Sequence, residues 1–104
     1  MAKTRFSIIM DYQNAMRQAD RISDAADKLA ARENEIQQYI NTIRISWIGE
    51  NASNYLRKLE KSKNNLTKLK ANLKNISDVT RRIARRTYDT EMATLEISQR
   101  RSYH

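Results

Sequence analysis

One stretch near the middle of the chain decides how it folds: residues 46–55, Ser-Trp-Ile-Gly-Glu-Asn-Ala-Ser-Asn-Tyr. It contains the only Trp and the only Gly among 104 residues, and the chain has no Pro. Because Gly readily adopts the backbone conformations of a sharp reversal, we expect two long helices to fold back on each other within residues 46–50. Ser46 would end the first helix, and the second would begin with Asn51 as its N-cap or with Glu50 in its first turn.

The residues before this turn follow the repeat of a long packed helix over about residues 6–45. Apolar or small residues recur at alternating intervals of four and three, which is the pattern of a heptad seam. The seam consists of Ile8, Tyr12, Ala15, Ala19, Ile22, Ala26, Leu29, Glu33, Ile36, Ile40 and Ile43. Its small middle residues would let a neighbouring helix approach closely. Glu33 either reaches out to solvent or fixes the register by pairing with a cation on the facing helix.

A second seam predicts a helix over about residues 51–95. Its members are Ala52, Tyr55, Leu59, Ser62, Leu66, Leu69, Leu73, Ile76, Thr80, Ile83 and Thr87. A first helix of ~38 residues would cover its antiparallel partner only to about residue 88. We therefore expect the end of the chain, to His104, to project as a frayed tail.

These features predict an all-α fold, with residues 1–104 forming a single antiparallel two-helix hairpin. Apolar residues beside the two seams, Ile9, Met16, Leu56 and Val79, widen the apolar face beyond what one neighbouring helix can cover. The cost of ordering the chain nearly cancels the stabilisation from one shared seam. We therefore expect the hairpin to pair into a four-helix bundle, with a second copy or with a related hairpin.

Composition argues against catalysis and against bound cofactors or metals. The chain has no Cys, its one His is residue 104, and it shows no nucleophile–base pair, carboxylate dyad or phosphate-binding Gly-rich loop. No apolar run is long enough to cross a membrane. The apolar piece after the basic N-terminus spans only residues 6–10, so we expect no signal peptide.

Positive charge is concentrated in the second half of the chain. Residues 1–45 have seven basic and six acidic side chains, whereas residues 46–104 have thirteen and six, which together give the net charge of +8. A basic patch is formed by Arg81, Arg82, Arg85 and Arg86, which recur at intervals of four. The patch is either a solvated face, an attraction for an acidic protein, or a site for nucleic acid or an anionic membrane. Nucleic acid is the weakest of these because the basic half offers few aromatic residues to stack on bases.

The central turn resembles the signature of the WXG family, the small helical-hairpin proteins of type VII secretion systems. Trp47 and Gly49 match the Trp-x-Gly triplet, and Ala52 and Tyr55 match a small residue five positions and an aromatic residue eight positions after the Trp. The resemblance covers nearly the whole chain. It implies that Trp47 and Gly49 shape the turn, and that the Trp contributes to a recognition surface made with a partner's tail.

The same resemblance concerns Tyr88, which lies in the region where the family has an export signal. Family partners have a Tyr followed four residues later by an acidic residue as an export signal. Here the fourth residue is Met92, and Glu91 comes at the third. Tyr88 and Glu91 are therefore either an export-signal region or an ordinary exposed pair on a helix.

The resemblance implies a non-enzymatic protein that is cytoplasmic before export and then leaves the cell by the type VII route. It would act as a secreted dimer, or as a chaperone or targeting partner that packs against the helical domain of an exported effector. Small helical proteins that accompany LXG toxins are the nearest precedent. The partners implied are a second copy or another hairpin, such as an LXG-type domain, and the secretion machinery. The alternative is a basic helical adaptor that binds nucleic acid or an anionic membrane through Arg81, Arg82, Arg85 and Arg86.

Overall fold

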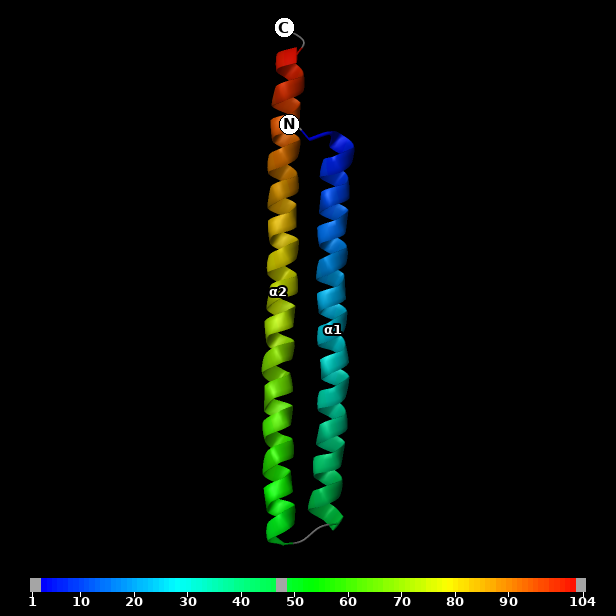
Figure 1. The fold of residues 1–104 in the computed structure, drawn as a ribbon, viewed down its shortest axis with the longest axis vertical. Coiled ribbons are helices and arrows are strands. Elements are labelled where there is room, and N and C mark those ends of the chain that lie inside the picture. Colours follow the sequence, from blue (N-terminus) through cyan, green and yellow to red (C-terminus); the bar gives the residue numbers. More distant parts are fainter. Residues whose placement is uncertain (1–2, 47–48, 103–104) are drawn as a thin grey trace. The chain divides into compact units, whose positions relative to one another are not determined.

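The computed structural model of the chain describes residues 3–46 and 49–102, and two long helices account for nearly all of them (Figure 1). Helix α1 spans Arg5–Ser46 and helix α2 spans Glu50–Ser102. No strand occurs within the described ranges. The all-α prediction is confirmed, and its physical basis is the period of the apolar residues together with the absence of Pro.

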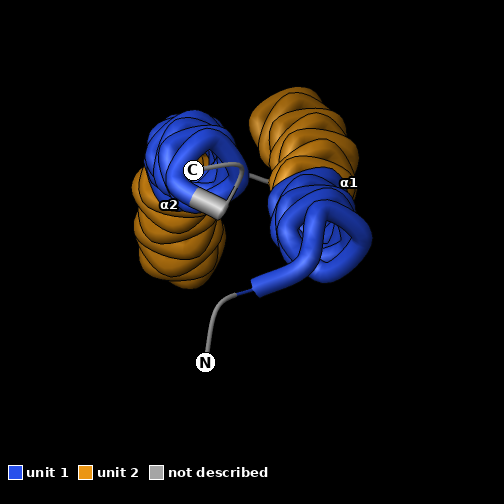
Figure 2. Tube along the Cα trace, turned by 90° about the horizontal axis from the view of Figure 1, so that it is seen from above, with its two compact units in different colours: residues 1–22, 75–104 blue, residues 23–74 orange. Residues whose placement is uncertain are grey.

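The chain divides into two compact units, each of which combines a segment of both helices (Figure 2). Unit 1 comprises Met1–Ile22 and Asn75–His104, and unit 2 comprises Ser23–Lys74. Contacts within each unit show that the helices run antiparallel. In unit 1, Lys3 contacts Glu91 and Asp20 contacts Arg81. In unit 2, Glu33 contacts Lys70 and Arg44 contacts Glu60. The residue number on α2 falls as that on α1 rises, as a hairpin requires.

The side of α1 that faces α2 contains the residues of the first seam. Ile8, Ala19, Ala26, Ile40 and Ile43 are buried. The remaining seam residues are half-buried: Tyr12, Ala15, Ile22, Leu29, Glu33 and Ile36. Ala19 and Ala26 have no exposed surface, because Ala leaves room for the backbone of the neighbouring helix to come close.

The side of α2 that faces α1 differs from the expected seam at every second position. Ala52 is buried and Leu59, Leu66, Leu73 and Thr80 are half-buried, as the pattern predicts. At each alternate position, the residue that is shielded is the one directly after the residue that the pattern predicts. Leu56, Lys63, Lys70, Ser77 and Ala84 lie against α1 or are shielded, whereas Tyr55, Ser62, Leu69, Ile76 and Ile83 are exposed.

Specific polar contacts explain this displacement. The Ser77 hydroxyl donates a hydrogen bond of 2.8 Å to the carbonyl oxygen of Ala19, and Ser77 is almost completely buried. Lys70 places its ammonium 3.0 Å from a carboxylate oxygen of Glu33. Apolarity alone favours Leu69 and Ile76 at the contact, but small or pairing side chains permit closer packing and satisfy polar groups.

Gly49 separates the two helices. Its φ of +126° lies where residues with a Cβ are strained, and its carbonyl oxygen accepts the amide hydrogen bond of Ser53 at 3.2 Å. Helix α2 therefore begins at Glu50, and Asn51 already lies within it rather than capping it. Trp47 and Ile48 lie outside the described residues.

Helix α2 extends further than the sequence analysis expected. It ends at Ser102 rather than near residue 95. The added turns contain neither Gly nor Pro, and Arg100 and Arg101 in the last turn complement the negative end of the helix dipole. These local preferences favour helix even where α1 offers no cover.

Gly49→Ala should lower the free energy of unfolding by about 1–3 kcal/mol, because Ala must adopt a strained φ. Nothing lies within 4 Å of an added Cβ, so steric contact would not contribute. Urea denaturation followed by circular dichroism, at one fixed protein concentration, measures the change. The exposed Asn54→Ala variant is the control, with an expected change below about 0.5 kcal/mol. Equal effects of the two variants would contradict the explanation by backbone strain.

Ser77→Ala should cost about 0.5–1.5 kcal/mol, because it removes the hydrogen bond to Ala19 without adding volume. Ser77→Leu should cost more than Ser77→Ala, since overpacking alone costs about 1–3 kcal/mol. The same denaturation measurement compares the two. A Leu variant at least as stable as the native chain would show that the helices do not approach closely at this point.

Candidate interaction surface

Unit 1 has an open, mostly apolar groove between α1 and α2. Its volume is about 290 Å³. Its walls are formed by Ile8, Asp11, Tyr12, Ala15, Thr80, Ile83, Ala84, Thr87, Tyr88 and Glu91. The rings of Tyr12 and Tyr88 meet there, with centroids 5.0 Å apart and planes inclined at 46°. The groove presents apolar surface with little capacity for chemistry, which suits protein contact.

Tyr88 and Glu91 both belong to this part of the hairpin. Tyr88 is half-buried against Tyr12, and a carboxylate oxygen of Glu91 accepts a hydrogen bond of 2.8 Å from the Lys3 ammonium. Lys3 also contacts Asp11 at 3.1 Å, and these bonds, that to Glu91 first, raise the pKa of Lys3. The interpretation of Tyr88 and Glu91 as an ordinary exposed pair is therefore wrong. The cause is that α1 begins early enough to cover α2 as far as Glu91.

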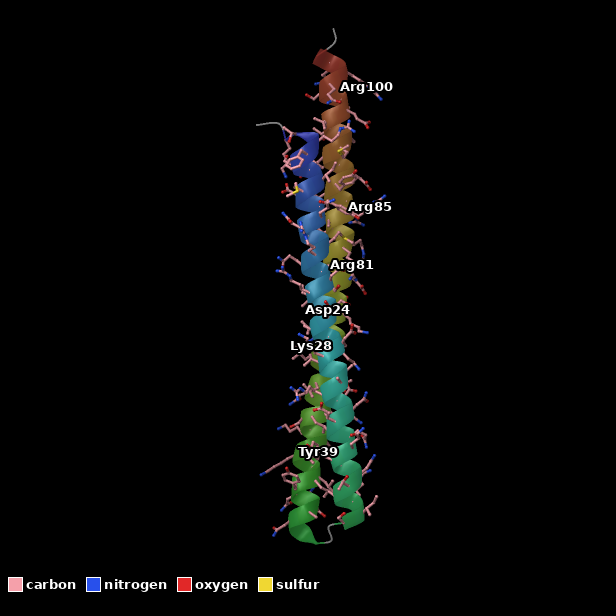
Figure 3. All side chains as sticks on the ribbon, turned by 90° about the vertical axis from the view of Figure 1, so that its right-hand side faces the viewer. Asp24, Lys28, Tyr39, Arg81, Arg85 and Arg100 are labelled. Carbon is pink, nitrogen blue, oxygen red and sulfur yellow. The ribbon has the colours of Figure 1, made fainter. Side chains whose placement is uncertain are left out.

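The basic patch is divided between internal pairing and exposure. Arg81 lies 2.9 Å from Asp20 on α1 and 3.6 Å from Asp78. Arg85, one turn further along α2 (Figure 3), lies 3.6 Å from Asp89, and a hydrogen bond with the Tyr12 hydroxyl raises its pKa.

The other two arginines, Arg82 and Arg86, are exposed, and neither has an ion pair with any described residue. Half of the expected patch therefore stabilises the hairpin, and half remains available to a partner.

Glu33 pairs with a cation on the facing helix, which is one of its two predicted roles. Its carboxylate is mostly shielded, and the Lys70 ammonium lies 3.0 Å away. Bonding to Lys70 lowers the pKa of Glu33, with smaller contributions from Thr67 and Lys63, while burial opposes the shift. Lys63 in turn donates to the side-chain oxygen of Gln37. Lysines at seam positions thus fix the register of unit 2 through polar contacts.

A row of large apolar side chains on α2 remains in solvent beside the seam. The exposed fractions are 48% for Tyr55, 47% for Leu69, 48% for Ile76 and 57% for Ile83. Phe6, Met10, Tyr39 and Ile45 of α1 and Ile97 of α2 are exposed as well. Single exposed apolar residues are ordinary, but repetition at intervals of seven along one helix marks a contact face.

Several residues that hold the two helices together were not predicted from the sequence. Lys3, Lys63, Lys70 and Ser77 join the two helices, and none was singled out. Lys63, Lys70 and Ser77 share the seven-residue spacing of Leu56 and Ala84. That spacing was the available signal, but Lys70 and Ser77 directly follow the apolar Leu69 and Ile76, which suit a seam better.

Two kinds of functional feature are absent from residues 3–46 and 49–102. No cluster of His, Cys, Asp or Glu side chains could hold a metal ion. Neither helix offers a stretch with the length and apolarity needed to cross a membrane.

Comparison with known proteins gives one match. The family model WXG100, described as proteins of 100 residues with WXG, matches residues 7–92. The match covers most of α1, the turn and most of α2. No curated protein and no solved structure matches the chain.

Acidification should weaken the hairpin partly through Glu33. Its pKa is depressed from the ordinary 4.5 in the folded state, so its contribution is present above that value and is lost as pH falls through the lower folded pKa. Glu33→Gln should therefore flatten the fall in unfolding free energy between about pH 5 and pH 2. Glu35→Gln, which removes an exposed carboxylate paired with Arg32, is the matched control. A Glu33→Gln curve parallel to that of the native chain would refute the linkage.

Proposed function

The chain belongs to the WXG100 family, whose members are small helical proteins associated with type VII secretion, and on this basis we propose that it serves such a system by pairing lengthwise with another helical hairpin. Proteins of this family are non-enzymatic and typically dimerise. The proposed product is a secreted dimer, or a complex in which this chain is chaperone and targeting partner for the helical domain of an exported effector. An LXG-type domain is one candidate for that effector.

The exposed apolar row on α2 is the observation that supports pairing. Leu69, Ile76 and Ile83 are each about half exposed although they recur at the spacing of a helix contact face. Within residues 3–46 and 49–102, neither α1 nor another part of α2 covers these side chains. A second hairpin laid alongside would bury the row and complete a four-helix bundle.

Within this proposal the heteromer is favoured over the self-dimer. The net charge of +8 opposes association of two copies and favours a partner of opposite charge. The chain would be in the cytoplasm when it meets that partner, before export of the complex or of the effector. Trp47 and Gly49 would shape the turn, and the Trp would also contribute to recognition.

Binding of nucleic acid or of an anionic membrane through the basic patch has less support. Phosphate binding needs several free cations close together. Arg81 and Arg85 are instead held in contacts within the hairpin, which leaves Arg82 and Arg86.

The pairing proposal is tested with Leu69→Glu, Ile76→Glu and Ile83→Glu combined in one chain. Burying a large apolar side chain fully contributes about 1.5–3 kcal/mol. Since 1.4 kcal/mol is tenfold in affinity, the triple variant should weaken association with its partner by at least about a hundredfold. Light scattering coupled to gel filtration, on the chain alone and co-expressed with type VII effectors of the same bacterium, measures the complex.

A matched triple variant, Asn64→Glu, Ala71→Glu and Gln99→Glu, introduces the same charge at exposed positions on another side of α2 and should keep the association. Circular dichroism establishes that both variants remain helical. Deleting the gene should also reduce type VII export in the producing bacterium. A chain that stays monomeric with every effector, and whose deletion leaves export unchanged, would disprove the proposed function.

A further inference from the structure

The cations of α2 separate into two groups according to the surface they occupy. Lys63, Lys70 and Arg81 contact side chains of α1 and lie at the edge of the shared seam. A second group lies on the other flank of α2 and consists of Lys58, Lys61, Lys68, Arg82 and Arg86. All five are exposed, and none pairs with a described residue.

These five cations lie beside the exposed apolar row of α2 in both units. In unit 2, Leu69 has Lys58, Lys61 and Lys68 on the same flank. Heptad geometry gives the reason: positions three and six residues after a seam residue lie next to each other on a helix. Leu69 follows the seam residue Leu66 by three, and Lys58 follows Ala52 by six.

The same pattern recurs in unit 1. Ile76 and Ile83 follow Leu73 and Thr80 by three, and Arg86 follows Thr80 by six. Arg82 lies beyond Arg86 on the outer side of the flank. Each unit therefore presents apolar side chains with unpaired cations alongside: Leu69 with Lys58, Lys61 and Lys68 in unit 2, and Ile76 and Ile83 with Arg82 and Arg86 in unit 1. We call these residues of α2 the cationic flank.

One acidic residue, Asp89, lies close to the cationic flank: it follows Arg86 by three residues and contacts Arg85 at 3.6 Å. Between residues 51 and 88, α2 has only two acidic residues, Glu60 and Asp78. Glu60 binds Arg44 of α1 at 2.6 Å, and Asp78 lies 3.6 Å from Arg81 of α2, so both are paired with cations outside the flank. The five cations of the flank therefore leave it with a net positive charge in each unit.

We propose that the cationic flank docks an acidic amphipathic helix of a different chain, and that it disfavours a second copy of this one. This inference rests on the proposed function and specifies the chemistry of the partner. Its docking helix would have an apolar seam bordered by Asp and Glu, so that burial of Leu69, Ile76 and Ile83 brings its carboxylates beside the free lysines and arginines. Two copies joined through the same flank would instead bring ten cations together, and like charges across an interface act against binding.

A charge-reversed copy of the chain can serve as the probe, because it presents the same apolar side chains with acidic neighbours. The flank variant combines Lys58→Glu, Lys68→Glu and Arg86→Glu. The matched control combines Arg57→Glu, Lys74→Glu and Arg101→Glu, three exposed cations outside the flank. Each replacement of a Lys or Arg by Glu lowers the net charge by two, so three replacements lower it from +8 to +2 in both variants. Circular dichroism compares their helix content before binding is measured.

The native chain should bind the flank variant at least about tenfold more tightly than it binds either itself or the control, at a salt concentration of about 50 mM. Analytical ultracentrifugation of the mixtures, with one component fluorescently labelled, gives the dissociation constants. The advantage of the flank variant should shrink as salt is raised to about 0.5 M, because salt screens exposed charges.

Equal binding of the flank variant and the control would show that net charge alone governs association, and would overturn the inference. Self-association of the native chain that is as tight as its binding to the flank variant would overturn it too, by making a second copy the occupant. These outcomes are separate from those for the proposed function. Export that depends on the gene, with no preference for the flank variant, would leave the proposed function standing and remove only the acidic partner.

Discussion

A pair of helices has a single contact face, and this geometric limit governs the rest of the structure. Each helix can bury one stripe of side chains against the other, so only a few residues, chiefly Ile8, Ala19, Ala26 and Ile40, are almost fully buried. When the apolar face of a helix is too broad for one neighbouring helix to cover, part of that face stays in solvent. In α2 that part is the row containing Leu69, Ile76 and Ile83. A role in pairing follows from the same limit, because another hairpin is the simplest cover for such a row.

Polar contacts within the seam decide how the two helices meet. The Ser77 hydroxyl bonds the backbone of Ala19 where both residues are small and buried, and Lys70 pairs with Glu33 in the other unit. These contacts are specific to one register, whereas apolar side chains pack in several. A buried or partly buried polar pair often serves specificity more than stability. In this chain, such pairs also turn Leu69 and Ile76 outward, so the internal register and the external surface have a common cause.

The cations of α2 divide between the contact with α1 and the outward apolar row. Arg81, Lys63 and Lys70 are used within the hairpin, while the unpaired cations border the outward apolar row. Membership of the WXG100 family places the chain among proteins of type VII secretion that typically dimerise. Under the proposal made above, the free cations would favour an acidic partner over a second copy. Tyr88 and Glu91 take part in closing the hairpin at Tyr12 and Lys3, so any role as an export signal would involve residues that already have internal contacts.

The sequence alone predicted the number of helices, the position of the chain reversal and the family. These depend on local properties: a 3.5-residue period, one Gly, no Pro, and the Trp-x-Gly triplet at residues 47–49. The seam of α1 followed as well, because its apolar stripe has no competitor. The stripe of α2 that meets α1 could not be predicted, since Lys70, Ser77 and Ala84 directly follow the more apolar Leu69, Ile76 and Ile83. Only contact with Glu33 and with the backbone of Ala19 distinguishes the two stripes, and those groups belong to the other helix. The pairing of Lys3 with Glu91 is likewise visible only in three dimensions, because it joins residues 88 positions apart.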